Sequence, residues 1–374
     1  MRVRILFVID GMEFGGGERV FTQIINGLPL DKYELFLASG PQESFYQAIA
    51  KTPIQCYPLD FSNRFNPAII FRLVKIIKDN KIDIVHGQGG RAEFFARLAS
   101  CLFRRSRYIS TIAMPVEGYD VGPIKRLLYK GLDRFSEKFV DYFLVVSSAL
   151  EQTMIHNHGI PREKVVRIYN GIETNHYKPD DQEAGRRRVR QEYAVNEREI
   201  LIGSLGRLVW QKGFEFFLQS IPMLLQDIPG LRFMLVGEGP LRQELEGQAR
   251  SLGIQDRILF TGHRNDIKDM MAAMDILVIP SLLEGFPMIT LEAMAMEKPI
   301  VTTAIDGITE QIRDGKEGLL VAPKSPPALA QAVKRLVDDP GYASSLGINA
   351  RVKAVQDFSV RKMISETIKV YEAL

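Results

Sequence analysis

Two glutamates separated by seven residues are the part of the sequence that most directly suggests chemistry. Glu284 lies in a loop after the apolar run 276–279, and Glu292 lies in the first turns of a helix that begins near Pro287. The positive end of a helix dipole stabilises a carboxylate, and carboxylate oxygens accept hydrogen bonds from hydroxyl groups. The pair therefore predicts a site for sugar or ribose hydroxyls. Alternatively, each glutamate taken alone is a solvated surface charge.

Two cations form the second candidate site, Arg207 and Lys212, in a loop that follows the apolar run 200–204 and is flanked by Gly206 and Gly213. An arginine binds phosphate through two parallel N–H groups, whereas a lysine acts as a point charge. Two such groups five positions apart at one strand end predict a phosphate site. Either residue alone is equally compatible with an ordinary exposed charge.

Two glycine-rich loops also follow predicted strands. Gly15, Gly16 and Gly17 precede Glu18 at the start of a helix, where backbone N–H groups favour an anion. A second loop, 237–240, reads Gly-Glu-Gly-Pro, and its proline suits the first turn of a helix. The first loop lacks the dinucleotide spacing G-x-G-x-x-G, and no acidic residue ends the next strand near Ala38. Both loops suit close contact with phosphate or sugar, or alternatively are tight turns without a ligand.

These loops are positioned by strands and helices that alternate along the whole chain. Such alternation predicts an α/β fold with parallel sheets that are covered on both faces. The predicted strands are 3–9, 34–38, 82–86, 107–112, 142–146, 200–204, 231–236, 257–261, 276–279 and 299–303. The predicted helices of the first half are 19–28, 67–80 and 92–102, and a last amphipathic helix covers 360–374.

The length of 374 residues is too great for one hydrophobic core and favours two domains. The polar segment Pro179–Arg198 interrupts the pattern, and we interpret it as a linker with an exposed helix that carries the basic run Arg186–Arg190. We therefore expect one domain at 1–178, joined by the helix 360–374, and a second at 179–359. Ligands bind beyond the carboxyl ends of strands in such sheets, which predicts one cleft between two Rossmann-like domains.

Composition excludes several classes of function. A net charge of +3 is too small for a nucleic-acid-binding protein, and two cysteines cannot form a disulfide framework. The first apolar run is too short for a signal peptide, and no stretch reaches the length of a membrane span. We expect a cytoplasmic protein.

Charge is unevenly distributed, because residues 1–178 hold 24 Lys and Arg against 18 Asp and Glu. Segment 91–138 alone carries ten basic and five acidic residues, with aromatic and leucine side chains between them. Basic amphipathic surfaces bind anionic membranes, which predicts peripheral contact with the cytoplasmic face of the inner membrane. Alternatively, these are ordinary helix faces. The basic residues are Arg91, Arg97, Arg104, Arg105, Arg107, Lys125, Arg126, Lys130, Arg134 and Lys138.

The motifs together resemble the retaining glycosyltransferases of family 4, which have the GT-B fold. Glu284 and Glu292 match the paired-glutamate motif of that family, and Arg207 with Lys212 match its phosphate-binding pair. The loop 15–18 and the segment 170–173, Asn-Gly-Ile-Glu, extend the similarity over essentially the whole chain.

The resemblance implies a role for each motif. Arg207 and Lys212 would hold the diphosphate of a nucleotide-sugar donor, Glu292 the ribose, and Glu284 the hydroxyls of the donor sugar. Backbone near Arg264 would meet the base. Further donor-binding positions implied in this way are Gly16, Gly17, Gly237, Gly285, Phe286, Pro287 and Met288.

One position departs from the family. Many relatives have Thr-x-His after a strand of the first domain, whereas this chain has Ala113 after Thr111 and Ile112. His86 ends another predicted strand and is either near the cleft or packed in the core. The histidines show no clear ligand pattern, so we expect no metal and no cofactor, the nucleotide sugar being a substrate.

The expected function is transfer of a hexose from a nucleotide sugar, UDP or GDP, to a glycan or lipid-linked acceptor. The expected setting is the synthesis of cell-envelope polysaccharide, lipopolysaccharide or exopolysaccharide. Alternatives are a nucleotide-sugar epimerase or a phosphorylase of the same fold, and less favourably a dinucleotide-dependent dehydrogenase. An epimerase needs acid and base residues that the sequence does not reveal.

Overall fold

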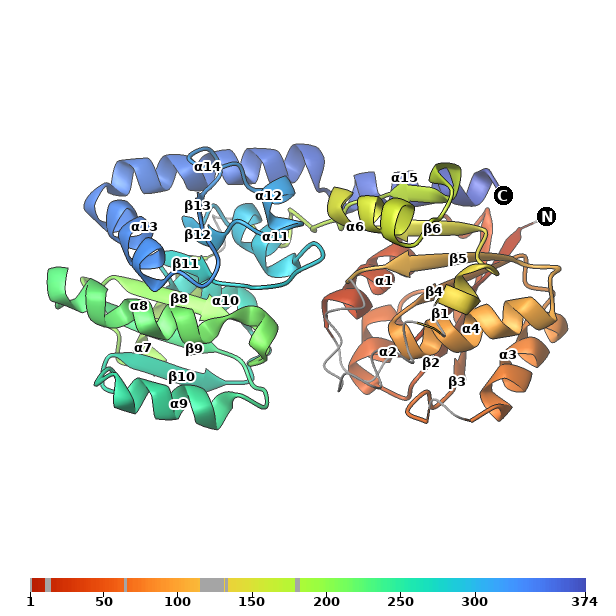
Figure 1. Cartoon of the computed structure of the whole chain (residues 1–374), viewed down its shortest axis with the longest axis horizontal. Helices are drawn as coiled ribbons and strands as arrows, with labels where there is room; N and C mark the ends of the chain where they lie inside the picture. The colour runs from red at the N-terminus through yellow and green to blue at the C-terminus, as the bar shows by residue number, and fades with distance from the viewer. Residues whose placement is uncertain (1, 11–14, 64–65, 115–130, 132–133, 179–181) are drawn as a thin grey trace. The chain divides into compact units, whose positions relative to one another are not determined.

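The computed structural model describes residues 2–10, 15–63, 66–114, 131, 134–178 and 182–374. The chain forms two compact units, which are described separately. Unit 1 contains Met1–Gly171 and Val360–Leu374, and unit 2 contains Ile172–Ser359. The boundary at 171/172 lies seven residues before the position expected from the polar segment. Figure 1 shows both units with their elements labelled.

Unit 1 is built on one parallel sheet, with seven strands among the described residues in the order β3-β2-β1-β4-β5-β6-β7. In register, Ile5 of β1 lies between Leu35 of β2 and Ile84 of β4. The strands are β1 Val3–Ile9, β2 Tyr33–Ser39, β3 Ile54–Pro58, β4 Ile84–Gln88, β5 Arg107–Ile112, β6 Tyr142–Val145 and β7 Val165–Arg167. The main helices are α1 Gly16–Gly27, α2 Glu43–Ile49, α3 Ala68–Asp79, α4 Gly90–Leu102, α6 Ser148–Gln152 and α15 Val360–Glu372.

Unit 2 has a second parallel sheet, with six strands in its described residues in the order β10-β9-β8-β11-β12-β13. The strands are β8 Leu201–Leu205, β9 Arg232–Val236, β10 Ile258–Gly262, β11 Ile276–Ile279, β12 Ile300–Thr303 and β13 Leu319–Val321. The helices are α7 Glu183–Glu192, α8 Phe214–Asp227, α9 Arg242–Ser251, α10 Ile267–Ala273, α11 Met288–Ala295, α12 Ile308–Gln311, α13 Pro326–Asp338 and α14 Pro340–Asp357.

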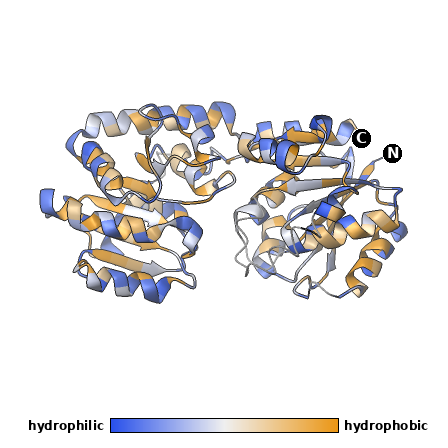
Figure 2. Ribbon diagram, in the orientation of Figure 1, coloured by the Kyte–Doolittle hydropathy of each residue, from blue (hydrophilic) through white to orange (hydrophobic). Residues whose placement is uncertain are grey.

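Each sheet is buried because its strands are apolar along both faces, as parallel strands under helices require. All five residues of β8 are buried, and so are all four of β11 and of β12. The apolar colouring of Figure 2 runs through the strands and the inner faces of the helices. In unit 2 one hydrophobic cluster joins the sheet to α8, α9 and α13.

The last helix belongs to unit 1 although it follows unit 2 in the sequence. Ile364 on α15 packs so closely on α1 that a Cβ added at Gly27 would lie 2.1 Å from its Cδ1 atom. Lys32 and Glu372 form an ion pair at 3.0 Å. The prediction that the final helix returns to the first domain agrees with this packing.

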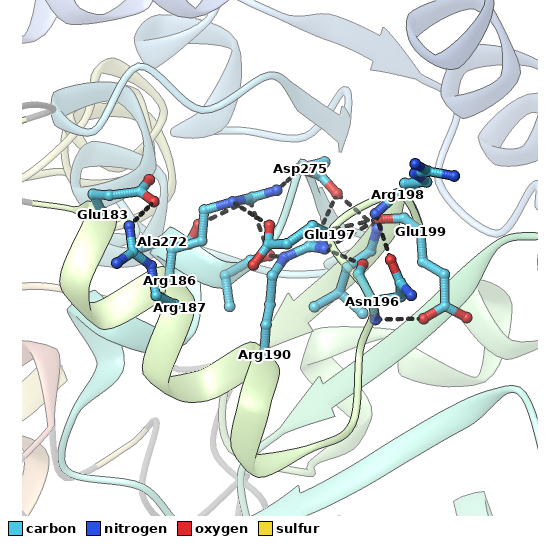
Figure 3. Close-up of polar contacts among 12 residues, drawn as sticks. Glu183, Arg186, Arg187, Arg190, Asn196, Glu197, Arg198, Glu199, Ala272 and Asp275 are labelled. Carbon is cyan, nitrogen blue, oxygen red and sulfur yellow. Dashed lines mark hydrogen bonds and ion pairs between the residues drawn. The ribbon is translucent and has the colours of Figure 1, made fainter.

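Helix α7 corrects one prediction, because it is not an exposed helix on a linker. Arg190 is only 1% exposed, and its guanidinium donates to the carbonyls of Ala273 and Glu199 and to the carboxylate of Asp275. Arg186 also contacts Asp275, at 2.9 Å. Figure 3 shows these side chains pointing from α7 toward the residues before β8 and β11. Arg186 and Arg190 of the basic run therefore anchor α7 to the rest of unit 2, whereas Arg187 stays exposed.

Candidate active site

The loop after β8 carries the two predicted phosphate-binding cations. Arg207 is exposed, whereas Lys212 is partly buried at the end of a short 3₁₀ turn, Trp210–Lys212. The loop is braced by backbone bonds from Leu208 N to Glu238 O at 2.8 Å and from Leu282 N to Gln211 O at 2.7 Å. Gly213 has φ +60°, and a Cβ there would lie 2.3 Å from the carbonyl oxygen of Pro280. This glycine therefore allows the β8 loop to lie directly on the β11 loop.

That close approach brings Lys212 to Glu284, 72 residues later. Lys212 Nζ donates to Glu284 Oε1 at 2.6 Å, and Ser281 Oγ donates to the same oxygen at 2.8 Å. The side chains are 23% and 5% exposed, respectively. The predicted phosphate-binding lysine and the predicted sugar-binding glutamate thus form one ion pair.

The second glutamate lies on α11, which begins directly after the Gly285–Pro287 segment. Pro287 precedes the helix in an extended conformation, and its carbonyl accepts a bond from Gln311 Nε2 at 3.0 Å. Glu292 is 2% exposed, and its Oε1 accepts a hydrogen bond from Tyr177 Oη at 3.0 Å. Glu292 is the fifth of the eight residues of α11, so it lies in the middle of the helix rather than in the first turns expected from the sequence, where the dipole would favour negative charge.

The backbone between the glutamates is tightly packed. Phe286 is buried against Phe358 in an edge-to-face contact with ring centroids 5.3 Å apart. Gly307 has φ +79°, and a Cβ there would lie 2.0 Å from the carbonyl oxygen of Gly285. The predicted donor-binding residues Gly285, Phe286, Pro287 and Met288 are all buried, so a ligand would meet them through an edge of the backbone rather than through mobile side chains.

The loop after β9 lies against the loop after β8. Gly206 N donates to Val236 O at 3.0 Å, and Gly237 N donates to Gly262 O at 2.9 Å. Gly237 has φ +139°, and a Cβ would lie 1.9 Å from the carbonyl oxygen of Gly206. The ends of β8, β9 and β10 therefore form a continuous backbone ledge in unit 2.

Arg264, predicted to lie near the base of the donor, has its side chain engaged within the protein. Its guanidinium binds both carboxylate oxygens of Glu192 at 2.6 and 3.0 Å and both of Asp266 at 2.8 Å. The bond from Arg264 is the main cause that holds the pKa of Asp266 far below its usual range. A contact with the donor would therefore come from the backbone at this position, as the resemblance implies.

In unit 1 the glycine-rich loop opens α1 at the carboxyl edge of the sheet. Gly15 precedes the helix, and Glu18 accepts from Gly15 N at 3.0 Å. A Cβ at Gly17 would lie 2.7 Å from Gln88 Nε2, at the end of β4. Asp10, after β1, accepts from Ala92 N at the start of α4 at 2.5 Å. Gly17 thus lies beside the end of β4, and Gly16 precedes it as the first residue of α1.

His86 is a packed core residue. It is fully buried, with Nδ1 at 2.6 Å from Tyr371 Oη and Nε2 at 2.6 Å from Thr111 Oγ1. Burial lowers the pKa of His86 to about 3, so the ring is neutral. His86 ties β4 to β5 and α15, which resolves the two interpretations left open by the sequence. Ala113 follows β5 and is partly buried.

The basic segment 91–138 is only partly a surface. Arg97 is 3% exposed and pairs with Glu93, so it is excluded from any membrane contact. Lys125, Arg126 and Lys130 lie outside the described residues. We define the basic patch as five exposed residues near the end of α4 and the start of β6, Leu102, Arg104, Arg105, Phe135 and Lys138.

Sequence reasoning missed the partners of the glutamates. Ser281, Tyr177 and Gln311 fix Glu284, Glu292 and Pro287, yet each has an unremarkable sequence context. The one available signal was Tyr177, which follows the Asn-Gly motif at 170–171 by six residues.

No helix of the described chain is long and apolar enough to cross a bilayer. Its described residues also contain no cluster of three or more metal-ligating side chains.

Comparison with protein families adds two matches that together span most of the chain. Residues 185–353 match the family model described as glycosyl transferases group 1, and residues 14–176 match the model described as glycosyltransferase family 4. The first lies within unit 2 and the second covers most of unit 1 before the boundary.

Individual relatives are glycosyltransferases. An uncharacterized glycosyltransferase of Methanocaldococcus jannaschii is 30% identical over 61% of this chain, but the chain spans only 59% of that relative. The UDP-Gal:α-D-GlcNAc-diphosphoundecaprenol α-1,3-galactosyltransferase of Escherichia coli is 24% identical over 95% of this chain and 93% of the relative. The crystal structure of Anabaena HepE with UDP-glucose aligns over 100% of both chains, with 23% identity and a TM-score of 0.86.

Proposed function

The chain belongs to the group 1 glycosyltransferases and has the GT-B fold, and we propose that it transfers a sugar from a nucleotide-sugar donor to a glycan or lipid-linked acceptor. The observation that carries this proposal is the set of groups gathered after β8 and β11. One partly buried lysine, Lys212, contacts one buried glutamate, Glu284, and a second buried glutamate, Glu292, follows on α11. Cations suit a diphosphate, and carboxylates suit sugar hydroxyls.

In the proposed reaction, unit 2 binds the donor. Arg207 and Lys212 hold the diphosphate and stabilise the charge that develops on it as the bond to the sugar breaks. Glu284, fixed by Lys212 and Ser281, accepts hydrogen bonds from the donor sugar. The ledge of backbone at Gly206 and Gly237 approaches the donor without intervening side chains.

We further propose that transfer retains the anomeric configuration. The acceptor hydroxyl attacks from the side of the leaving diphosphate, and that diphosphate accepts the proton of the hydroxyl. The protein then contributes positioning and charge stabilisation rather than a carboxylate nucleophile. This proposal includes no metal and no cofactor.

The relatives make one donor and one acceptor class the first to test. The Anabaena structure contains UDP-glucose, and the E. coli relative is named for UDP-galactose and a diphosphoundecaprenol-linked sugar. We therefore propose a UDP-hexose donor, with a GDP-sugar as the second choice. A lipid-linked acceptor would place the reaction in cell-envelope polysaccharide synthesis, at the cytoplasmic face of the membrane.

The donor assignment is tested with the purified full-length protein. A thermal-shift series with UDP, GDP, ADP and NAD is expected to show stabilisation by UDP. Incubation with UDP-hexoses is expected to release UDP slowly by hydrolysis, and faster with an acceptor. The anomeric coupling constant of the product, measured by NMR, is expected to match that of the donor. Stabilisation by NAD alone would refute the proposal, and an inverted product would refute the retaining mechanism.

Contact with a membrane is proposed through the basic patch. The Arg104 guanidinium lies over the ring of Phe139 at 5.6 Å, and that ring contacts Phe135, whose side chain is 55% exposed. Exposed apolar side chains beside cations suit an anionic lipid surface.

The membrane proposal is tested by flotation at low salt with phosphatidylglycerol vesicles. The wild type is expected to float, and the double charge reversal Arg104→Glu/Lys138→Glu is expected to lose most of this binding. The control pair Lys51→Glu/Lys316→Glu changes net charge equally at exposed sites elsewhere. Equal losses in both double variants would show non-specific charge attraction and would remove the proposed contact.

A further inference from the structure

Tyr177 lies outside every motif that the sequence revealed, yet it contacts one of the paired glutamates. Its hydroxyl donates to Glu292 Oε1 at 3.0 Å, across 115 residues of sequence. Tyr177 comes five residues after Ile172, where unit 2 begins, and Glu292 lies on α11 of the same unit. The contact is therefore internal to unit 2.

The backbone of Tyr177 is itself held in place. Arg351, on α14, donates from Nη1 to Tyr177 O at 3.0 Å and also to the carbonyl of Ala295. Ala295 is the last residue of α11, the helix that carries Glu292. The Arg351 guanidinium thus connects the backbone at Tyr177 to the end of α11. The Tyr177 hydroxyl connects the same residue to the middle of α11, through Glu292.

Arg351 and the neighbours of Tyr177 hold this tyrosine in one position. The side chain of Arg351 is 20% exposed, and its Nε lies 3.6 Å from Glu297 Oε1, just beyond α11. The ring of Tyr177 also packs edge-to-face on His176, with centroids 4.9 Å apart. Tyr177 is therefore fixed at its backbone, ring and hydroxyl, which makes it a rigid donor rather than a mobile surface side chain.

A rigid donor on one oxygen selects one orientation of a carboxylate. Ionised carboxylates accept hydrogen bonds at about four lone-pair positions, so a carboxylate that is held by a tyrosine hydroxyl can also accept hydrogen bonds from ligand hydroxyls. A site whose buried polar groups are satisfied by substrate hydroxyls rejects analogues that lack those hydroxyls.

We propose that Tyr177, anchored by Arg351, is a positioning residue that orients Glu292 toward the ribose hydroxyls and makes the site select ribonucleotides over deoxyribonucleotides. This inference rests on the proposed function, because that function assigns Glu292 to the ribose. It adds the residue that sets the orientation, and it predicts discrimination at a hydroxyl rather than a general effect on binding.

The test measures Kd by isothermal titration calorimetry for UDP and for 2′,3′-dideoxy-UDP. The variant Tyr177→Phe removes one oxygen and keeps the ring. This variant is expected to weaken the affinity for UDP by about tenfold and the affinity for dideoxy-UDP by less than about twofold, since hydrogen bonds to charged groups are among the stronger ones. With saturating donor, kcat is expected to stay within about twofold of wild type, the loss appearing in KM.

Three further variants complete the design. Tyr342→Phe is the matched control, because Tyr342 lies in the same unit with its ring beneath Arg335 and far along the sequence from α11. In Tyr177→Phe/Glu292→Gln the UDP affinity is expected to match that of Glu292→Gln alone, since the tyrosine acts through the glutamate.

The outcomes separate this inference from the proposed function. Equal losses for UDP and dideoxy-UDP in Tyr177→Phe, unchanged UDP affinity in that variant, or additive losses in the double variant would each overturn the positioning role while leaving a nucleotide-binding enzyme. Failure of the wild type to bind UDP, GDP or ADP would overturn the proposed function and this inference together. The only tryptophan of the chain, Trp210, is 39% exposed two residues before Lys212 and provides a second, fluorescence readout of binding.

Discussion

Replacing each of the two predicted phosphate-binding cations is expected to have the same effect on rate and different effects on stability. Arg207 is exposed, whereas Lys212 contacts Glu284, whose side chain is only 5% exposed. In Arg207→Met and Lys212→Met we expect transfer or donor hydrolysis to fall by about 10²–10³, by analogy with the loss of one preorganised donor to a developing charge.

The difference in stability follows from the burial of Glu284. Removing one partner of a fully buried ion pair costs about 3–5 kcal/mol because the other charge is left uncompensated. Lys212 is 23% exposed and Ser281 still donates to the carboxylate, so we expect about 2–3 kcal/mol for Lys212→Met. For a unit of 150–250 residues this lowers Tm by roughly 4–12 °C. Arg207→Met is expected to change stability by no more than about 0.5 kcal/mol, as for other surface changes.

The assay combines urea unfolding, thermal melting and UDP release from UDP-hexose for both single variants and for Lys212→Met/Glu284→Gln. In the double variant the buried charge is gone, so most of the lost stability is expected to return while the rate stays low. Equal melting of the two single variants would refute the reasoning about burial. Full activity in either one would refute the role of that cation.

Three other predictions concern the scaffold. Arg190→Leu is expected to destabilise unit 2 by about 2–3 kcal/mol in urea unfolding, because the carbonyls of Ala273 and Glu199 lose a buried donor while Asp275, which is 29% exposed, keeps its contact with Arg186. The exposed Arg187→Leu should cost less than about 0.5 kcal/mol, and similar values for both variants would contradict the buried role of α7. Gly237→Ala is expected to cost several kcal/mol in thermal melts, because its Cβ would lie 1.9 Å from Gly206 O, against about 1 kcal/mol for Gly253→Ala, which has open space at φ +68°. The pKa of His86 is about 3 in the folded chain and near 6.5 when unfolded, so the neutral ring stabilises the fold fully above pH 6.5 and less as pH falls toward 3. We expect the free energy of unfolding of unit 1 to be about 2 kcal/mol lower at pH 5 than at pH 7, and to depend less on pH in His86→Gln.

Strands in the sheet interiors could be predicted closely from sequence, whereas three of the four edge strands of the described sheets were missed, β10 being the exception. The ranges of β1, β5 and β11 match the predicted runs because each is rich in β-branched, aromatic and other apolar residues between loops, although only β11 is apolar throughout. The missed strands β3, β7 and β13 each lie at a sheet edge. Edge strands need less apolar sequence because one side meets solvent, and β3 has no fully buried residue and ends in Pro58.

The basic run 186–190 shows a different limit. Arginine is normally exposed, so its presence predicts a solvated face. Arg190 is buried here because its guanidinium meets carbonyls of Ala273, Asn196 and Glu199 together with Asp275. Some of these acceptors are more than 80 residues away in the sequence, and no local pattern in the run indicates them.

The candidate site shows why its charged residues could be predicted whereas their partners could not. Glu284 and Glu292 are linked by one loop and one helix, so their spacing is a local property that a single sequence displays. The contact between Lys212 and Glu284 instead depends on Gly213, because a Cβ at that position would clash with Pro280 O. The contact between Tyr177 and Glu292 depends on Arg351, which binds the backbone at both places. Chemistry requires particular side chains at particular spacings, but their orientation is fixed by glycines and buried donors that many sequences can supply from distant positions. A change at Gly213, Tyr177 or Arg351 would therefore alter the site while leaving every recognisable motif intact.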